Sequence, residues 1–153
     1  MPKFATERRV GHSADDMFAL VADVEAYPQF VPLCERLTVR KRSSEDGGRE
    51  ILVADMTVGY KAIRETFTTR VALDPQARII HAQYLDGPFS HLDNRWSFAP
   101  VDDRACTVSF SIDYDFRSRI LAAMMGAVFD RAFRKFATAF EERADKVYGA
   151  AVG

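Results

Sequence analysis

Cysteine is scarce in this sequence, and its scarcity argues against two kinds of site. The two thiols, Cys34 and Cys106, lie far apart and outside any CxxC spacing. Neither a disulfide framework nor a zinc site is therefore expected. Two reduced thiols in a cytoplasmic protein are the simplest interpretation, and no cofactor is expected.

Long apolar runs are also missing. No stretch approaches the roughly 18 apolar residues of a membrane-spanning helix. Phe4 is followed by charged residues instead of the apolar segment of a signal peptide. The sequence therefore predicts a cytoplasmic protein, with peripheral contact at the inner membrane as an option.

An excess of positive charge is missing as well. The chain has 21 Lys and Arg against 22 Asp and Glu, which gives a net charge of −1. A protein that binds nucleic acid by neutralising many phosphates needs a basic excess. DNA is therefore not an expected partner, although the balance still allows a local basic patch.

The chain does have enough length for one domain with a sizeable core. A domain of 153 residues buries roughly two thirds of its unfolded surface. Apolar residues make up 48% of the chain, and twelve of them are phenylalanines. Because no linker or internal repeat is present, a single domain is predicted over residues 1–148, with a disordered tail over 149–153.

The N-terminal part predicts a strand followed by two short helices. Residues 3–10 form the expected strand, and Ser13 starts a helix with the spacing of a capping box. Tyr27-Pro28 should stop this helix, because proline disfavours helical geometry in the residue before it. A second helical turn is expected over residues 29–31.

From Cys34 onward the apolar residues alternate with polar ones, which is typical of strands. The clearest alternation runs from Val108 to Phe116. About six consecutive strands with short turns indicate an antiparallel meander. Residues 118–148 then predict one long helix, because apolar residues recur there at steps of three and four.

This order of elements predicts an α+β fold in which a curved antiparallel sheet wraps around the C-terminal helix. The concave apolar face of the sheet must be covered, and the long helix is the one remaining element able to cover it. The space between them would be lined by phenylalanine and methionine, which suits an apolar ligand.

Three stretches carry a resemblance to a known family. They are Tyr27-Pro28-Gln29-Phe30-Val31-Pro32-Leu33-Cys34, Gly87-Pro88-Phe89 with the later Leu92, Trp96 and Phe98, and Asp113-Tyr114-Asp115-Phe116-Arg117-Ser118-Arg119-Ile120-Leu121. The chain resembles the START-like superfamily of polyketide cyclases/dehydrases and lipid transporters. Within it, the chain is similar to the coenzyme Q-binding proteins, a family shared with the bacterial ribosome-association toxins. The resemblance runs from about residue 4 to 147.

The resemblance implies a helix-grip fold of the START-like or Bet v type. It also implies a carrier or chaperone for a polyprenyl quinone such as ubiquinone, bound as a ligand and not as a cofactor. Such a protein would support respiratory electron transport or quinone biosynthesis without turning anything over. Burial of each methylene stabilises by about 0.8 kcal/mol, so an isoprenoid tail needs an apolar protein cavity to be carried through water.

Fourteen residues are candidates for the wall of the cavity, with ordinary core packing as the alternative role for each. They are Phe30, Pro32, Leu33, Cys34, Phe67, Tyr84, Phe89, Leu92, Trp96, Phe110, Met124, Met125, Phe129 and Phe133. Leu33 stands where many family members have tryptophan, which bears on ligand identity if that position touches the ligand. No catalytic residue is expected, because no histidine lies in a motif that would make it a base for Cys34.

Two other functions are compatible with the same sequence. A toxin-like protein would bind the large ribosomal subunit and block subunit association, and the arginines near residues 117–135 would then meet RNA. The same cations would alternatively meet anionic membrane headgroups. A polyketide cyclase or aromatase would need polar groups that face inward. Asn94 and Tyr114 are the only polar residues predicted to face inward.

Overall fold

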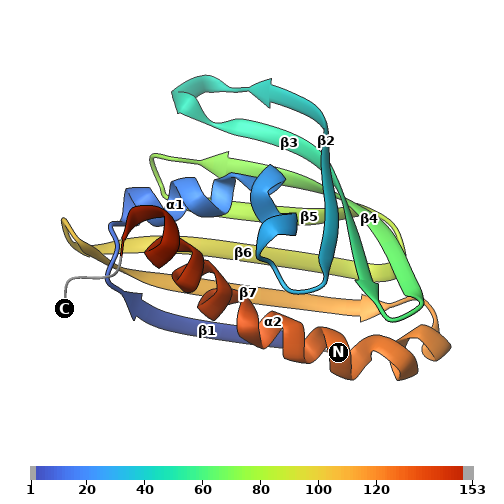
Figure 1. Ribbon diagram of the computed structural model, residues 1–153. Coiled ribbons are helices and arrows are strands. Elements are labelled where there is room, and N and C mark those ends of the chain that lie inside the picture. Colours follow the sequence, from blue (N-terminus) through green and yellow to red (C-terminus); the bar gives the residue numbers. More distant parts are fainter. Residues whose placement is uncertain (1–2, 150–153) are drawn as a thin grey trace.

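The computed structural model describes residues 3–149 and confirms the α+β helix-grip fold (Figure 1). A seven-stranded antiparallel sheet curves around one long helix. The elements are β1 (Lys3–Val10), α1 (Ala14–Ala22), η1 (Val24–Gln29), β2 (Cys34–Ser44), η2 (Asp46–Gly48), β3 (Glu50–Tyr60), β4 (Ile63–Asp74), β5 (Ile79–Asp86), β6 (Phe89–Asp102), β7 (Ala105–Phe116) and α2 (Arg119–Tyr148). Of the expected tail over 149–153, residues 150–153 lie outside the described part.

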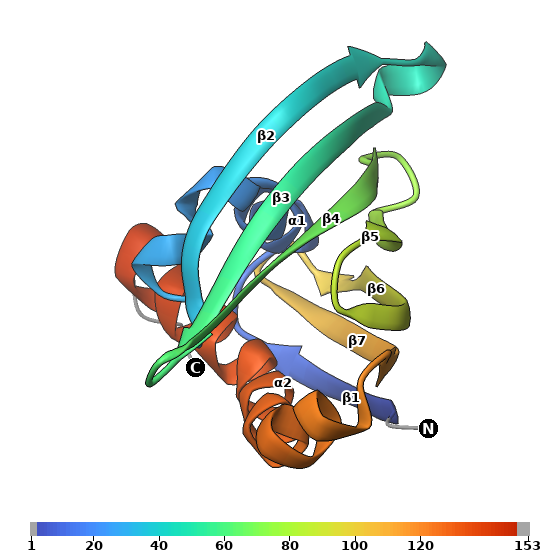
Figure 2. The same cartoon turned by 90° about the vertical axis from the view of Figure 1, so that its right-hand side faces the viewer.

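The strands follow the order β1-β7-β6-β5-β4-β3-β2. The predicted meander accounts for β2 to β7, and β1 adds to the free side of β7, with Lys3 opposite Asp113 and Val10 opposite Cys106. The two edges are therefore β1 and β2. Figure 2 shows that β2 and β3 extend away from the other strands, so the sheet is strongly coiled.

The short helices near the N-terminus differ in one respect from the prediction. Ser13 caps α1 as expected, and its hydroxyl accepts a hydrogen bond from the Asp16 amide at 3.1 Å. Asp23 then leaves helical geometry (φ −81°, ψ 71°), so a separate 3₁₀ helix spans Val24–Gln29 and includes Pro28. The turn predicted at 29–31 is thus wrong in position, because the chain breaks at Asp23 before the proline is reached.

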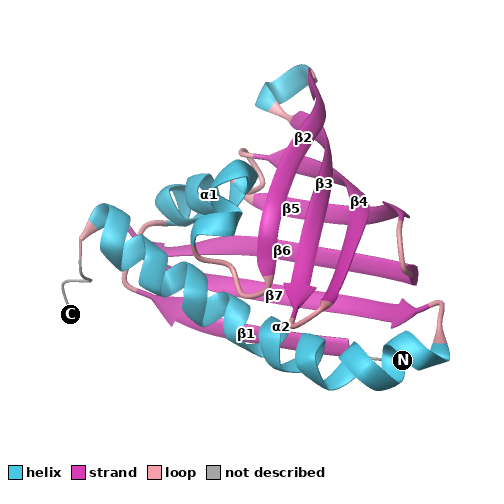
Figure 3. Cartoon of the chain, turned by 45° about the vertical axis from the view of Figure 1, so that its right-hand side comes forward, coloured by secondary structure: helices cyan, strands magenta, loops and turns pink. Residues whose placement is uncertain are grey.

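Helix α2 crosses the concave face of the sheet, as Figure 3 shows. Ser118 caps it by accepting a hydrogen bond from the Leu121 amide at 3.1 Å. The buried side of the helix carries an apolar stripe of one methionine with phenylalanines and alanines, whose members are Met125, Phe129, Ala132, Phe133, Ala137, Phe140 and Ala144. The helix therefore supplies the second layer of a two-layer core.

Phe89 is the centre of an aromatic cluster under the first half of α2. Its ring is fully buried and lies 5.0 Å from the ring of Phe116, 5.3 Å from that of Phe67 and 6.0 Å from that of Phe129. Gly87 allows the approach, because its φ is +140° and a Cβ there would come within 2.6 Å of the Phe67 Cβ. The Gly-Pro-Phe sequence is thus explained by packing.

The outer edge of the sheet is strand β2, which is exposed over most of its length. Its side chains include four cations, Arg36, Arg40, Lys41 and Arg42. Two irregularities in its pairing with β3 lie between Cys34 and Arg36 and between Val39 and Lys41. Bulges and charged side chains are common features of natural edge strands.

Candidate functional site

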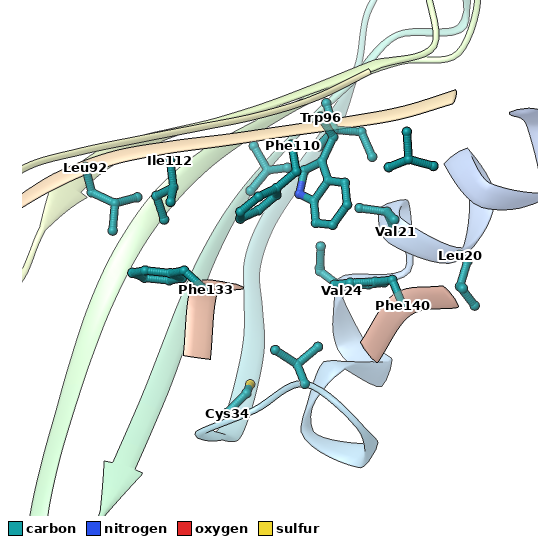
Figure 4. Close-up of a cluster of buried hydrophobic side chains, with 14 of the residues drawn as sticks. Leu20, Val21, Val24, Cys34, Leu92, Trp96, Phe110, Ile112, Phe133 and Phe140 are labelled. Atoms are coloured by element: carbon teal, nitrogen blue, oxygen red, sulfur yellow. The ribbon is translucent and has the colours of Figure 1, made fainter. Parts of the chain in front are cut away.

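A cavity of about 90 Å³ lies between the concave face of the sheet and the second half of α2. Figure 4 shows part of its wall, with Trp96, Leu92 and Ile112 on the sheet facing Phe133 and Phe140 on the helix. The lining residues are Val24, Tyr27, Pro32, Leu33, Leu37, Ala54, Met56, Val58, Phe67, Thr69, Val71, Ile80, Ala82, Leu92, Asn94, Trp96, Ile112, Ala132, Phe133, Phe136 and Phe140.

The lining is almost entirely apolar. Its polar side chains are Tyr27, Thr69, Asn94 and the indole of Trp96, and none of the lining residues carries a charge. The Tyr27 hydroxyl donates to the carbonyl of Val21, and burial raises the pKa of this phenol far above its ordinary value. The Asn94 amide donates to the Ser111 carbonyl at 2.9 Å. The site is therefore suited to hold an uncharged molecule.

One wall is a strained turn at Pro32 and Leu33. Both residues are half-buried, and Leu33 has a φ of +68°, a conformation that side-chain-bearing residues rarely adopt. The Leu33 carbonyl accepts a hydrogen bond from the Gly59 amide at 3.0 Å, which ties the turn to the end of β3. Strained residues of this kind concentrate at binding sites. Leu33 lies directly on the cavity.

Six of the fourteen predicted residues line this cavity. They are Pro32, Leu33, Phe67, Leu92, Trp96 and Phe133. The structure brings them together from the turn before β2, from β4, from β6 and from α2. Trp96 is buried among other aromatic rings, with its ring centre 4.6 Å from that of Phe110 and 4.9 Å from that of Phe140.

The other eight predicted residues lie beside the cavity and do not line it. Tyr84, Phe89 and Phe129 belong to the aromatic cluster under the first half of α2, while Phe110 and Met125 are buried in the neighbouring core. Phe30 packs edge-on against Phe140 at 5.0 Å, and Cys34 is buried behind the turn. Met124 faces away from the sheet and is 56% exposed.

The fourteen residues predicted from the sequence do not include the small residues that leave the space open. Ala54, Ala82 and Ala132 come from β3, β5 and α2, and all three line the cavity. The predicted residues are mostly large, yet a cavity forms where an inward-facing side chain is small. An alanine that faces inward between two bulky inward-facing residues is the sequence pattern that would have predicted the cavity.

Both thiols are buried, and burial governs their chemistry. Desolvation raises the pKa of Cys34 to about 11, against a smaller lowering by hydrogen bonding with the backbone of Arg36. Desolvation alone raises the pKa of Cys106 to about 11. The thiolate is the reactive form of cysteine, so neither residue is set up as a nucleophile.

A labelling experiment checks this inertness. At pH 8 about one thiol in a thousand is ionised when the pKa is near 11. We therefore expect iodoacetamide to label Cys34 and Cys106 at least about a hundredfold more slowly in the folded protein than in urea. Labelling should accelerate only as the pH rises toward 11. Intact mass measured over time gives the rates, and fast stoichiometric labelling of folded Cys34 at pH 8 would contradict the assignment.

The three histidines lie away from the cavity, each beside an aspartate. His12 is buried and contacts Asp145 near the end of α2 at 2.6 Å. His81 contacts Asp93 at 2.6 Å, and His91 contacts Asp113 at 3.0 Å, in positions that do not line the cavity. These pairs join elements of the fold.

Asp93 also accepts a hydrogen bond from Arg95. Desolvation would raise the pKa of Asp93, but the hydrogen bonds and charges of His81 and Arg95 together lower it.

Within residues 3–149, no group of three or more His, Cys, Asp or Glu could hold a metal ion. Over the same residues, neither helix is both long enough and apolar enough to cross a membrane.

Comparison with known families gives a match over most of the chain. Residues 10–141 match the family described as polyketide cyclase / dehydrase and lipid transport. The ribosome association toxin RatA of Vibrio cholerae is 34% identical over 149 residues, which is 97% of this chain and 99% of that protein.

Two further relatives carry other descriptions. The mitochondrial coenzyme Q-binding protein COQ10 homolog B of Xenopus laevis is 29% identical over 96% of this chain and 59% of its own length. Among solved structures, the Zhui aromatase/cyclase from Streptomyces sp. R1128 superposes with a TM-score of 0.79 at 21% identity, over 97% of this chain and 98% of that one. At that identity the likeness concerns the fold.

Proposed function

This chain belongs to the polyketide cyclase/dehydrase and lipid transport family, and from that membership we propose that it carries a polyprenyl quinone such as ubiquinone. The ligand binds in the cavity between the sheet and α2 and is released without chemical change. In this role the protein serves respiratory electron transport or quinone biosynthesis.

The observation that carries the proposal is the uncharged and almost entirely apolar lining of the cavity. A quinone is neutral, with an apolar ring and tail and two carbonyl oxygens that accept hydrogen bonds. Thr69 and Asn94 supply donors to such oxygens, because an amide nitrogen has two hydrogens and Asn94 uses one on Ser111. The remaining wall offers apolar contact to the tail, and burial of each methylene contributes about 0.8 kcal/mol.

The size of the cavity sets a condition on binding. Its 90 Å³ compares with the roughly 300–1,000 Å³ of ligand pockets in proteins. Entry of a quinone therefore displaces side chains of the wall or moves α2 from the sheet. Met56 and Leu33 are suited to give way, since both are half-buried and line the cavity.

The absence of charged groups from the lining also supports a carrier over an enzyme. A cyclase needs a positioned acid or base beside its substrate. The Tyr27 phenol is held protonated by burial and already donates its hydrogen bond. Thr69 and Asn94 act as hydrogen-bonding groups and neither gains nor loses a proton near neutral pH.

Trp96 provides the test. It is the single tryptophan of the chain and lines the cavity, so its fluorescence responds to a ligand bound there. Titration with a short-tailed, water-soluble ubiquinone should quench it saturably, with about one quinone bound per chain. A farnesol-type isoprenoid alcohol should compete without quenching. Quenching that rises linearly and matches that of free N-acetyltryptophanamide would refute the proposal.

The second candidate is a toxin-like action on the large ribosomal subunit. It is favoured by the 34% identity to RatA over almost the full length of both proteins. The net charge of −1 gives it less support, because binding to RNA phosphates draws on basic residues. Co-sedimentation with large subunits that weakens with salt, by a protein purified without quinone, would make this function the leading one.

A further inference from the structure

The first turns of α2 present apolar side chains to solvent. Ile120 is 74% exposed and Met124 is 56% exposed. Ala123 and Ala127 are exposed as well. Their spacing of three and four residues places all four side chains on one side of the helix. This side lies away from the sheet, because Met125 and Phe129 of the same turns are buried against it.

Cations border this apolar side. Arg119 and Arg131 are both exposed. Among residues 3–149, no carboxylate lies within 4.0 Å of either guanidinium group. Asp130, the residue next to Arg131, is paired with Arg134 at 2.9 Å. From 116 to 129 the sequence contains no Asp or Glu at all.

Both features are unfavourable for a helix that faces only water. Helix N-termini favour acidic residues, because the aligned peptide dipoles place positive charge there. The first turn of α2 holds no acid and begins with Arg119. Exposed Ile120 and Met124 add apolar surface that water does not favour. Residues that are locally unfavourable for the structure in which they lie indicate a functional surface.

We propose that this surface docks the protein onto an anionic lipid bilayer. We call it the α2 docking face, made of Arg119, Ile120, Ala123, Met124, Ala127 and Arg131. Isoleucine and methionine enter the boundary between headgroups and acyl chains, while the arginines meet lipid phosphates and anionic headgroups. The combination of apolar residues with unpaired cations is typical of helices that lie in a membrane interface.

The charges and the apolar residues together favour a bilayer over other occupants. In a symmetric pair of chains this face would meet itself, and Arg119 and Arg131 would face like charges. RNA would use the arginines but has no use for exposed Ile120 and Met124, since proteins bind bases by stacking aromatic or guanidinium groups on them. An anionic bilayer satisfies both kinds of side chain.

The docking face and the cavity lie on opposite sides of one helix. Ala132, Phe133 and Phe136 follow in the next turns of α2 and line the cavity. A bilayer that holds the outer side of α2 therefore also holds the helix that forms one wall of the cavity. The docking itself needs no quinone, so it can be tested apart from the proposed function.

Vesicle co-sedimentation of the full chain tests the proposal. Wild-type protein should sediment with vesicles that contain phosphatidylglycerol and at least about tenfold less with vesicles of phosphatidylcholine alone. The double variants Ile120→Ser/Met124→Ser and Arg119→Glu/Arg131→Glu should each weaken binding about tenfold or more. Added salt should weaken the wild type and leave little further loss in the arginine variant.

Matched controls use residues of the same kind elsewhere. Leu85 and Val101 are 51% and 48% exposed, and Leu85→Ser/Val101→Ser should sediment like the wild type. Arg9→Glu/Arg104→Glu repeats the charge change on strand β1 and in the turn before β7. Saturable quenching of Trp96 by soluble quinone should persist in the docking variants, which shows that the fold and the cavity are intact.

Three outcomes would overturn the proposal. Wild-type protein that fails to sediment with anionic vesicles would do so, as would docking variants that bind like the wild type. The third outcome is a wild-type protein that binds large ribosomal subunits but not vesicles, and docking variants that no longer bind the subunits. This result would assign the face to RNA instead. Because the Trp96 assay runs in parallel, failure of docking is distinguished from failure of quinone binding.

Discussion

Ala54→Leu is expected to abolish the saturable quenching of Trp96 by quinone. Ala54 is 2% exposed and points from β3 into the cavity. Leucine adds three carbon atoms to a space of about 90 Å³, so the wall would have to move still further to admit a ring. The apparent Kd should rise at least about tenfold, while overpacking typically lowers the free energy of unfolding by about 1–3 kcal/mol.

A control with the same chemistry separates occlusion from general damage. Ala99 is an exposed alanine on β6, and Ala99→Leu should keep the Kd within about twofold of the wild type. Ala82→Leu approaches the cavity from β5 and should repeat the loss, which guards against a single variant that misfolds. A folded Ala54→Leu protein with an unchanged Kd would place the ligand elsewhere.

Phe89→Ala should cause the largest loss of stability. The ring of Phe89 is completely buried and touches rings from β4, β7 and α2. Phenylalanine-to-alanine changes in cores cost about 3–5 kcal/mol, through lost burial and the cavity left behind. Since small domains are stable by only about 5–15 kcal/mol, the variant should unfold at a much lower urea concentration. Urea titration followed by circular dichroism measures the change.

Leu85→Ala is the matched comparison for this second effect. Leu85 precedes the Gly-Pro-Phe turn and is 51% exposed, so its truncation should change the free energy of unfolding by no more than about 0.5 kcal/mol. If Phe89→Ala costs less than about 1 kcal/mol, then the cluster can collapse around the gap and Phe89 is not its centre.

The fold followed from the sequence because its patterns are strong. Strict alternation from Val108 to Phe116 became β7, whose residues alternate between buried and half-buried. The apolar stripe after Ser118 became α2 with the predicted cap and end. The break at Asp23 carried no signal of its own, since aspartate is compatible with a helix, and so the 3₁₀ helix was misplaced.

The cavity was harder to predict, because periodicity tells which residues face inward but not which of them leave space. Phe89 and Trp96 both face inward, yet one fills its surroundings and the other borders a void. The adjacent methionines illustrate the limit on the helix. Met125 is buried and Met124 is exposed, since neighbouring residues are turned by about 100° around a helix and cannot both face the sheet.

The exposed edge strand β2 bears on self-association. An open edge offers unpaired amides and carbonyls to any other strand, and a second copy of the same strand is always at hand in solution. Two β2 strands that met in this way would bring Arg36, Arg40, Lys41 and Arg42 of one copy against those of the other. Like charges facing each other across strands are destabilising, and the two bulges disturb the ladder further. The edge that ends the sheet thus also acts against its growth into a polymer.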